Sequence, residues 1–245
     1  MRFPVLFGAA LAQAVIFGQT DTRPRFAVAS VKQSDSGARG RLSFPPGQAV
    51  LLHSRLKDVI PFAYGVQSFL VSGGPGWLGT EFYDIVAKMP FTEGAPPQQE
   101  QVLRALQVLL EERFQLKVHW EPKDMTVFKL QVTKEGFKLK EGEQLPENTP
   151  LGFEKRTASR IVRRDARISS LVTALSAYLG YPVLDETGLT GSYSFSLAWQ
   201  HEEGDNNSDF EMIAALRTQI GLNLEKGKGP VKTLVIDSAE KPGAN

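Results

Sequence analysis

The residues of this sequence most able to do chemistry are its few histidines and the carboxylates near them. His119 and Glu121 stand two positions apart, so on a strand their side chains point to the same side. An imidazole beside a carboxylate can bind a metal ion, but catalytic zinc usually needs three protein ligands. The only other histidines are His53 and His201. The pattern therefore favours a solvent-facing polar pair over a metal site, and it predicts no cofactor.

Other catalytic patterns are incomplete. Asp185 and Glu186 are adjacent, so a strand would point them to opposite faces. Asp185 is expected instead to accept backbone hydrogen bonds from the turn at 187–191. The glycine-rich stretch 73–76 lacks the Lys and the Ser or Thr of a phosphate loop, and no Ser lies in a Gly-x-Ser-x-Gly elbow. We therefore predict that the protein is not an enzyme.

Aromatic side chains are candidates for contact with a partner. Trp77 follows the glycine-rich turn and is either a core residue or an exposed contact. The stretch Tyr193–Trp199 alternates large and small residues, as a strand with one buried face does. We predict that Trp77, Tyr193 and Trp199 take part in binding, with the two strand residues exposed.

Basic residues are concentrated in one stretch, which Glu154 and Asp165 dilute. On a strand, alternate positions would project several cations from one face, able to contact anionic lipid headgroups, a polyanionic cell-wall polymer or an acidic protein. The alternative is a solvated edge strand that its charges protect against aggregation. Arg160, Arg163 and Arg164 are the predicted binding residues here. The whole stretch comprises Lys155, Arg156, Arg160, Arg163, Arg164 and Arg167.

The composition narrows the class of protein. The chain has 245 residues, of which 42% are apolar, enough for a packed core. Its formal net charge of +1 gives no reason to expect nucleic acid as a partner. There is no cysteine, so disulfides, thiolate catalysis and cysteine-based metal sites are excluded.

The N-terminal segment is typical of a signal peptide over residues 1–18. Arg2 supplies positive charge, Phe3–Leu11 is apolar, and Ala12-Gln-Ala14 fits a cleavage site, although cleavage near Gly18 also fits. The apolar run is short for a bilayer span; a buried helix or an uncleaved anchor is the alternative. We expect a periplasmic or secreted protein with no transmembrane span in the mature chain.

One unit organises the chain and occurs twice. In Met212–Asp237, Ile213, Leu216 and Ile220 form a helical stripe and Gly221 ends the helix. Two strands are expected to follow, with a turn at 226–230 rich in Gly and Pro. Residues 102–132 show the same order, with a stripe at Leu103, Leu106 and Leu110. An internal repeat of this size is stronger evidence for the fold than any single residue.

Both halves extend this unit in the same way. Helices are expected at 56–64 and 168–179, each ended by a glycine, with strands at 82–89 and 193–199. The predicted fold is α+β, two tandem repeats of a hairpin–helix–strand–strand–helix–strand–strand module with mainly antiparallel sheets. The modules cover residues 26–133 and 151–240, and the segment 134–150, rich in Lys, Glu, Gly and Pro, is the predicted linker.

A series of motifs runs along the chain: Phe26–Lys32, Ala63–Val66, Gly73–Leu78, Tyr83–Lys88, Leu109–Glu121, Pro182–Gly191 with Tyr193 and Phe195, and Gly229–Pro242. Together these motifs resemble a known family of soil bacteria, domain of unknown function 3738. The resemblance covers nearly the whole mature chain and implies a secreted or envelope protein of uncharacterised function. Some relatives carry this region behind a membrane-bound regulatory metallopeptidase, whose His-Glu-x-x-His motif is missing here. The helix–strand–strand units are also similar in topology to small N-terminal domains of secretins and outer-membrane receptors.

The prediction for function is a non-catalytic binding or protein-interaction module outside the cytoplasm, in envelope sensing or assembly. The expected partner is an envelope or extracellular protein. The alternative is an envelope hydrolase or metal-dependent enzyme that uses His119 and Glu121 with a third residue. A structural secreted protein is a third reading.

Overall fold

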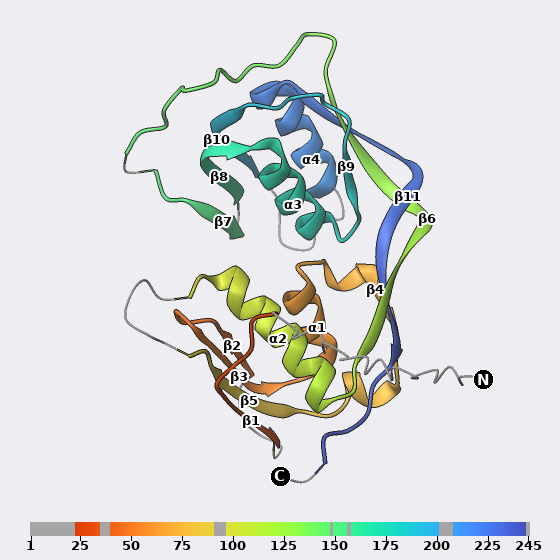
Figure 1. Cartoon of the computed structure of the whole chain (residues 1–245). Helices are drawn as coiled ribbons and strands as arrows, with labels where there is room; N and C mark the ends of the chain where they lie inside the picture. The colour runs from red at the N-terminus through yellow and green to blue at the C-terminus, as the bar shows by residue number, and fades with distance from the viewer. Residues whose placement is uncertain are drawn as a thin grey trace, which may run out of the picture.

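Two lobes joined by a long two-stranded ribbon make up the molecule (Figure 1). The computed structural model describes residues 23–34, 40–90, 97–147, 149–155, 158–200 and 208–243. The predicted signal peptide, the side chains of Lys155 and Arg156, and the loop with His201 lie outside the described residues. No helix within the described ranges has the length and apolarity of a membrane span.

The first lobe is a four-stranded antiparallel sheet with two helices packed on one face. The strand order is β1-β5-β3-β2. Val31, Ile85 and Leu51 are opposite one another in register and are buried, with 6%, 0% and 0% of their surface exposed. They share a core with residues of both helices. The elements are β1 (Val28–Gln33), β2 (Arg41–Ser43), β3 (Gln48–Ser54), α1 (Leu56–Tyr64), the 3-10 turns at Ser68–Leu70 and Gly76–Gly79, β4 (Val71–Gly73), β5 (Tyr83–Lys88) and α2 (Gln99–Arg113).

The second lobe repeats this layering with a smaller sheet. The strand order is β10-β8-β7, antiparallel throughout, and two helices pack against it. The second of these helices ends in one π-helical turn, Leu216–Ile220. The elements are β7 (Gly152–Lys155), β8 (Ala158–Arg167), α3 (Ile168–Leu179), β9 (Val183–Asp185), β10 (Ser192–Gln200) and α4 (Ser208–Ala215).

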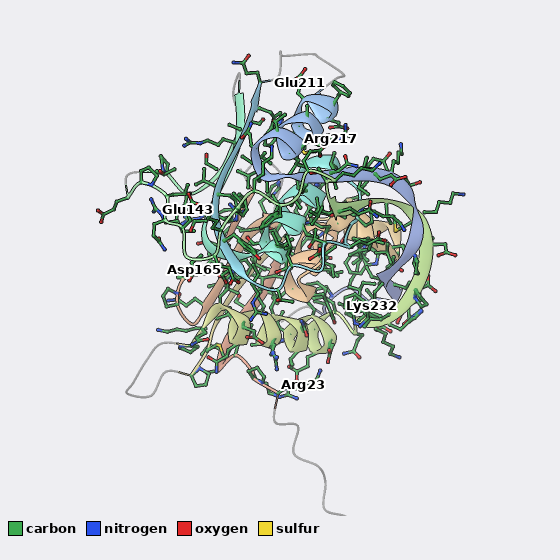
Figure 2. All side chains as sticks on the ribbon, turned by 90° about the horizontal axis from the view of Figure 1, so that it is seen from above. Arg23, Glu143, Asp165, Glu211, Arg217 and Lys232 are labelled. Carbon is green, nitrogen blue, oxygen red and sulfur yellow. The ribbon has the colours of Figure 1, made fainter. Side chains whose placement is uncertain are left out.

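The ribbon consists of β6 (Lys117–Val132) and β11 (Leu222–Ser238), paired antiparallel along their whole length. At the first lobe, β4 adds to β11 in parallel; at the second, β9 adds to β6 in parallel. Seen from above, the ribbon bows away from the helices, and Lys232 lies on it (Figure 2). Both lobes thus share the same two strands.

The predicted turn at 226–230 is wrong, because β11 is continuous through it. Its burial pattern explains the error. Leu222 and Leu224 are buried in the second lobe, Gly229 to Thr233 are buried at odd positions, and Leu234 and Ile236 are buried in the first lobe. The phase of the alternation changes twice, as expected for a strongly twisted ribbon that enters two cores. A phase change beside Gly and Pro is also what a turn would produce. The hairpin predicted after the first helical stripe is wrong for the same reason, since β6 is one strand.

The predicted helix ends are confirmed. α1 spans Leu56–Tyr64 and α3 spans Ile168–Leu179, and Gly65 and Gly180 follow them in the left-handed conformation. Glycine reaches that conformation without the strain that a Cβ brings, which is why it stops these helices. Gly221 ends the later helix in the same way.

A shared irregularity precedes α1 and α3. His53 and Asp165 both have positive φ, 44° and 43°. Each stands three residues before the first residue of its helix, Leu56 of α1 or Ile168 of α3. The backbone N–H of His53 donates to Asp84 on β5, and that of Asp165 donates to Ser194 on β10. The α+β class with mostly antiparallel sheets is confirmed. The tandem repeat and the module boundaries stay predictions, which these matched bulges support.

Candidate functional site

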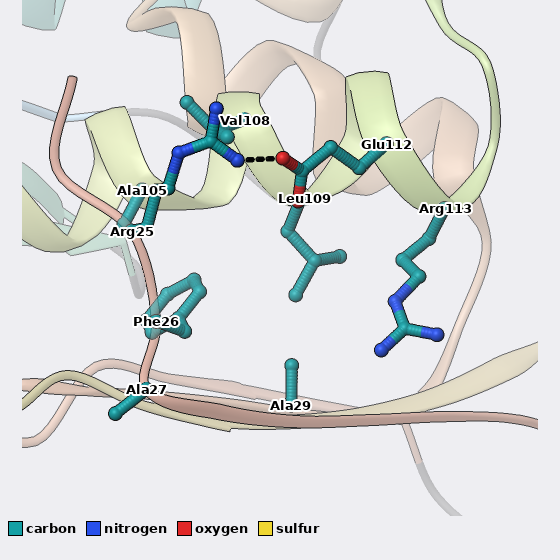
Figure 3. Close-up of a pocket in the computed structure, with 9 residues that line it drawn as sticks. All are labelled: Arg25, Phe26, Ala27, Ala29, Ala105, Val108, Leu109, Glu112 and Arg113. Carbon is teal, nitrogen blue, oxygen red and sulfur yellow. Dashed lines mark ion pairs between the residues drawn. The ribbon is translucent and has the colours of Figure 1, made fainter. Parts of the chain in front are cut away.

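A pocket opens between the start of β1 and one face of α2 (Figure 3). Its cavity volume is about 120 Å³, which is below the usual range for ligand pockets, roughly 300–1,000 Å³, and leaves room for a single small group. Its lining is apolar in the middle and charged at the rim, and comprises Arg25, Phe26, Ala27, Ala29, Ala105, Val108, Leu109, Glu112 and Arg113.

Small side chains leave this space open. Ala29 points from β1 toward the helix, whereas Ala27, two residues earlier, points away from it (Figure 3). Ala105 and Leu109 face the strand from α2 and are 1% and 4% exposed. A larger residue at Ala29 or Ala105 would fill the pocket, so the cavity depends on alanine at these two places.

Ion pairs hold the pocket's edge. The segment before β1 is tied to α2 by Arg25 with Glu112 and by Arg23 with Glu111, the latter at 2.6 Å between Nη1 and Oε2. Arg113, in the last turn of α2, stands at the other end of the opening (Figure 3). Because these side chains are partly exposed, each pair contributes modestly to stability. Their main effect is to position the strand's entry over the helix.

The pocket can bind an apolar group within a charged rim. The space is large enough for one apolar side chain, which would rest on Ala29, Ala105 and Leu109. The rim carries guanidinium groups and one carboxylate for polar neighbours of that group. No sequence pattern marked it, because Phe26, Ala29 and Ala105 read as ordinary core residues of a strand and a helix.

His119 and Glu121, for which the sequence favours a solvent-facing polar pair over a metal site, lie on β6 of the ribbon and do not line this pocket. His119 Nδ1 is 2.8 Å from Asp237 Oδ1, and its Nε2 is 4.0 Å from Glu121 Oε2. All three side chains are about half exposed. Across the described ranges, no group of three or more His, Cys, Asp or Glu residues is placed to hold a metal ion.

Asp185 has the role predicted for it. Its Oδ1 accepts hydrogen bonds from the backbone N–H and from the hydroxyl of Thr187, at 3.0 and 2.7 Å. Glu186 points elsewhere and pairs with Lys129 at 2.9 Å. The hydrogen bond from Lys129, followed by that from Gln131, lowers the pKa of Glu186. The two carboxylates therefore do not form one acid–base pair.

The predicted basic residues are engaged with their own chain. The Arg163 guanidinium donates to Ser170 Oγ at 2.9 Å and to the carbonyl oxygen of Gly152 at 3.3 Å. That of Arg164 donates to the carbonyl oxygens of Glu147 and Thr149, at 2.7 and 3.3 Å. Arg160 is partly buried. Arg164 thus fastens the end of the predicted linker to β8, whereas Arg163 ties β8 to α3 and β7. Binding through these arginines stays a prediction.

The predicted exposure of the strand aromatics is wrong. Tyr193 and Trp199 are only 7% and 4% exposed, because β10 turns this face toward α3 and α4. Trp77 is partly buried and packs at the edge of the first core, with its ring centroid 6.4 Å from that of Phe114. Aromatic residues in a strand occur both in cores and on binding surfaces, so the residue type alone does not show whether these side chains are buried or exposed.

The fold defines an α+β protein with two cores that share one ribbon and a pocket in the first lobe. The family of this chain follows from a direct match: residues 57–239 fit the family described as protein of unknown function (DUF3738), and the chain belongs to it. No curated protein and no solved structure matches this chain.

Proposed function

We propose that this protein is a non-catalytic binding module that acts outside the cytoplasm and holds a partner protein through the pocket between β1 and α2. The observation that carries the proposal is the apolar floor at Ala29, Ala105 and Leu109 within a rim of ion-paired side chains. Protein interfaces place their strongest contacts in such apolar pockets with a polar rim. An apolar side chain of the partner enters the pocket, and polar groups beside it meet Arg113 and Glu112.

The pocket's construction supports a preformed site. Leu109 and Ala105 belong to packed cores, so the floor keeps its shape without a ligand. The ion pairs of Arg23 and Arg25 hold the strand's entry in place. A site that needs little ordering on binding loses little affinity to conformational entropy.

The test is crosslinking of the tagged protein in intact cells, followed by mass spectrometry of what is captured. Ala29→Leu fills the pocket, and Val28→Leu enlarges the neighbouring side chain, which is 70% exposed, points to the other face of β1 and does not line the pocket. We expect one reproducible partner with the wild type and with Val28→Leu, and a loss of at least about ten-fold in its yield with Ala29→Leu. Thermal unfolding of both variants checks that they fold.

Two results would contradict this site. Equal capture by Ala29→Leu would place the contact elsewhere, and loss only with Arg160→Glu would place it on the basic stretch. Failure to capture any specific protein from intact cells would remove the support for a protein partner.

A further inference from the structure

The middle of the ribbon carries an outward face that no other helix or strand of the described residues covers. Pairing with β4 begins at Leu234, and pairing with β9 begins at Phe128, so between these points the ribbon has only its two strands. We call the solvent side of this part the outer ribbon face. It is formed by Trp120, Pro122, Asp124 and Thr126 of β6 and by Lys226, Lys228, Pro230 and Lys232 of β11.

Burial shows which way this face points. Val127, Val231 and Thr233, on the opposite side of the same strands, are 0%, 9% and 4% exposed. Gly229 on that side is buried as well. The ribbon bows outward with both lobes on its inner side (Figure 1). The outer ribbon face is therefore convex and turned to solvent.

Cations and aromatic rings alternate along it. Lys232 Nζ lies 4.6 Å from the ring centroid of Trp120, which is 40% exposed. Lys226 Nζ lies 5.5 Å from the ring centroid of Tyr181, a residue in the loop before β9 that is 41% exposed. Lys228 lies between them on β11. None of the three ammonium groups has a carboxylate within ion-pair distance in the part of the chain that the structure describes. Asp124 is the one acid on this face.

Two kinds of partner fit this face poorly. Strand addition to its edges is disfavoured, because Pro122 and Pro230 lack an N–H and a lysine lies within two residues of each. A small ligand would find no enclosure on a convex surface. The two aromatic rings of this face, Trp120 and Tyr181, also lie far apart. Tyr181 packs on Phe128, and Phe128 is eight residues from Trp120 along β6, or about 26 Å. A partner must therefore present negative charge over a broad area.

We propose that the outer ribbon face docks on an anionic lipid bilayer. Lysines near a negatively charged leaflet are attracted to its headgroups. Trp and Tyr rings favour the boundary between headgroups and acyl chains. A convex strip touches a flat surface first at its middle, where Lys228 lies, with Lys226 and Lys232 on either side of it. This contact is separate from the pocket between β1 and α2, so either proposal can fail without the other.

The test is sedimentation of the full chain with vesicles. One set contains phosphatidylcholine mixed with phosphatidylglycerol, whose headgroup is anionic, and a second set contains phosphatidylcholine alone. The triple change Lys226→Gln, Lys228→Gln and Lys232→Gln is compared with a matched triple change of the exposed residues Lys32, Lys88 and Lys134. Both variants carry the same net charge, and residues 1–22 are common to all.

We expect binding to the anionic vesicles only, and a loss of about a hundred-fold with the ribbon triple, since each lysine contributes roughly five-fold. The matched triple should keep most of the binding. Trp fluorescence should shift to shorter wavelength on anionic vesicles, and Trp120→Phe should abolish the shift.

Three results would overturn the proposal: no binding of the wild type, an equal loss with the matched triple, or binding to soluble dextran sulfate with none to vesicles. The last would assign the face to a polyanionic polymer instead.

Discussion

At the scale of single residues, the three glycines that follow helices differ in their surroundings. Gly180 and Gly221 both have positive φ, 68° and 80°. A Cβ at Gly180 would meet nothing within 4 Å, whereas one at Gly221 would lie 2.2 Å from the carbonyl oxygen of Gly136. The segment after β6 therefore presses against the end of the π-helical turn, and only glycine fits there.

The first prediction compares alanine at these two positions. Gly180→Ala should cost about 1–2 kcal/mol of unfolding free energy, the cost of the left-handed conformation for a residue with a Cβ. Gly221→Ala should cost about 1–3 kcal/mol more, because the backbone must also move. Urea unfolding of both variants measures the difference. Equal midpoints would mean that the segment 133–138 does not pack as described.

The second prediction concerns Tyr83, whose hydroxyl donates to Glu81 Oε2 at 2.9 Å. Burial, together with that carboxylate, raises the pKa of Tyr83 to about 12. Burial first, and then the charge of Glu111, also raises the pKa of Tyr64 to about 12. A pKa above the unfolded value near 10 means that the folded state holds the proton more tightly. The contribution of these two tyrosines to the unfolding free energy is therefore fully present below pH 10, and it is lost as the pH rises toward 12.

The absorbance of phenolate at 295 nm follows the titration of the tyrosines as the pH rises. Two of the five tyrosines should titrate late, and unfolding should follow them above pH 10. Tyr83→Phe should remove one late step and reduce the loss of unfolding free energy by roughly 1–2 kcal/mol. Ordinary titration of all five tyrosines near pH 10 in the folded protein would contradict the buried environment.

At the scale of elements, the sequence predicts features that depend on neighbouring residues, and it misses features that depend on contacts between distant parts of the chain. The helices 56–64 and 168–179 could be predicted to the residue, since apolar spacing and a terminal glycine are both local. The continuity of β11 could not, because the burial of Leu234 depends on a core built by residues 31–116. Likewise the pocket depends on Ala29 facing Ala105, and single positions in a strand and a distant helix do not reveal that they meet.

The contacts of Arg164 with a distant segment could not be predicted from the sequence either, and they lead to the third prediction. A basic stretch suggested a binding face, but the Arg164 guanidinium donates to the carbonyl oxygens of Pro146, Glu147 and Thr149 and so fastens this end of the linker. Arg164→Ala should expose this segment to protease at least about ten-fold faster and cost about 1 kcal/mol. Arg167→Ala is the control, because that side chain is exposed and makes no cap hydrogen bond. Equal cleavage of both variants would show that the segment is held by other contacts.

At the scale of the whole molecule, each core contains residues from both halves of the sequence. The first includes Leu234 and Ile236 of β11, and the second includes Phe128 and Leu130 of β6. Each lobe therefore lacks a strand unless the other half of the chain supplies it. The ribbon that makes this exchange is also the surface proposed to meet a bilayer, and it lies apart from Arg23 beside the pocket (Figure 2).

The last prediction follows from this exchange of strands. A chain cut within 134–150 gives two fragments, and neither should unfold cooperatively alone, because each leaves a row of core side chains exposed on its long strand. Mixing them should restore one cooperative transition and a 1:1 complex in size-exclusion chromatography. A peptide of residues 222–243 should stabilise the first fragment, whereas the same peptide with Leu234→Ala and Ile236→Ala should not, since deleting such buried side chains costs about 2–5 kcal/mol each. A first fragment that melts cooperatively alone, at the midpoint of the intact protein, would show that its lobe is complete without β11 and that the ribbon joins two independent domains.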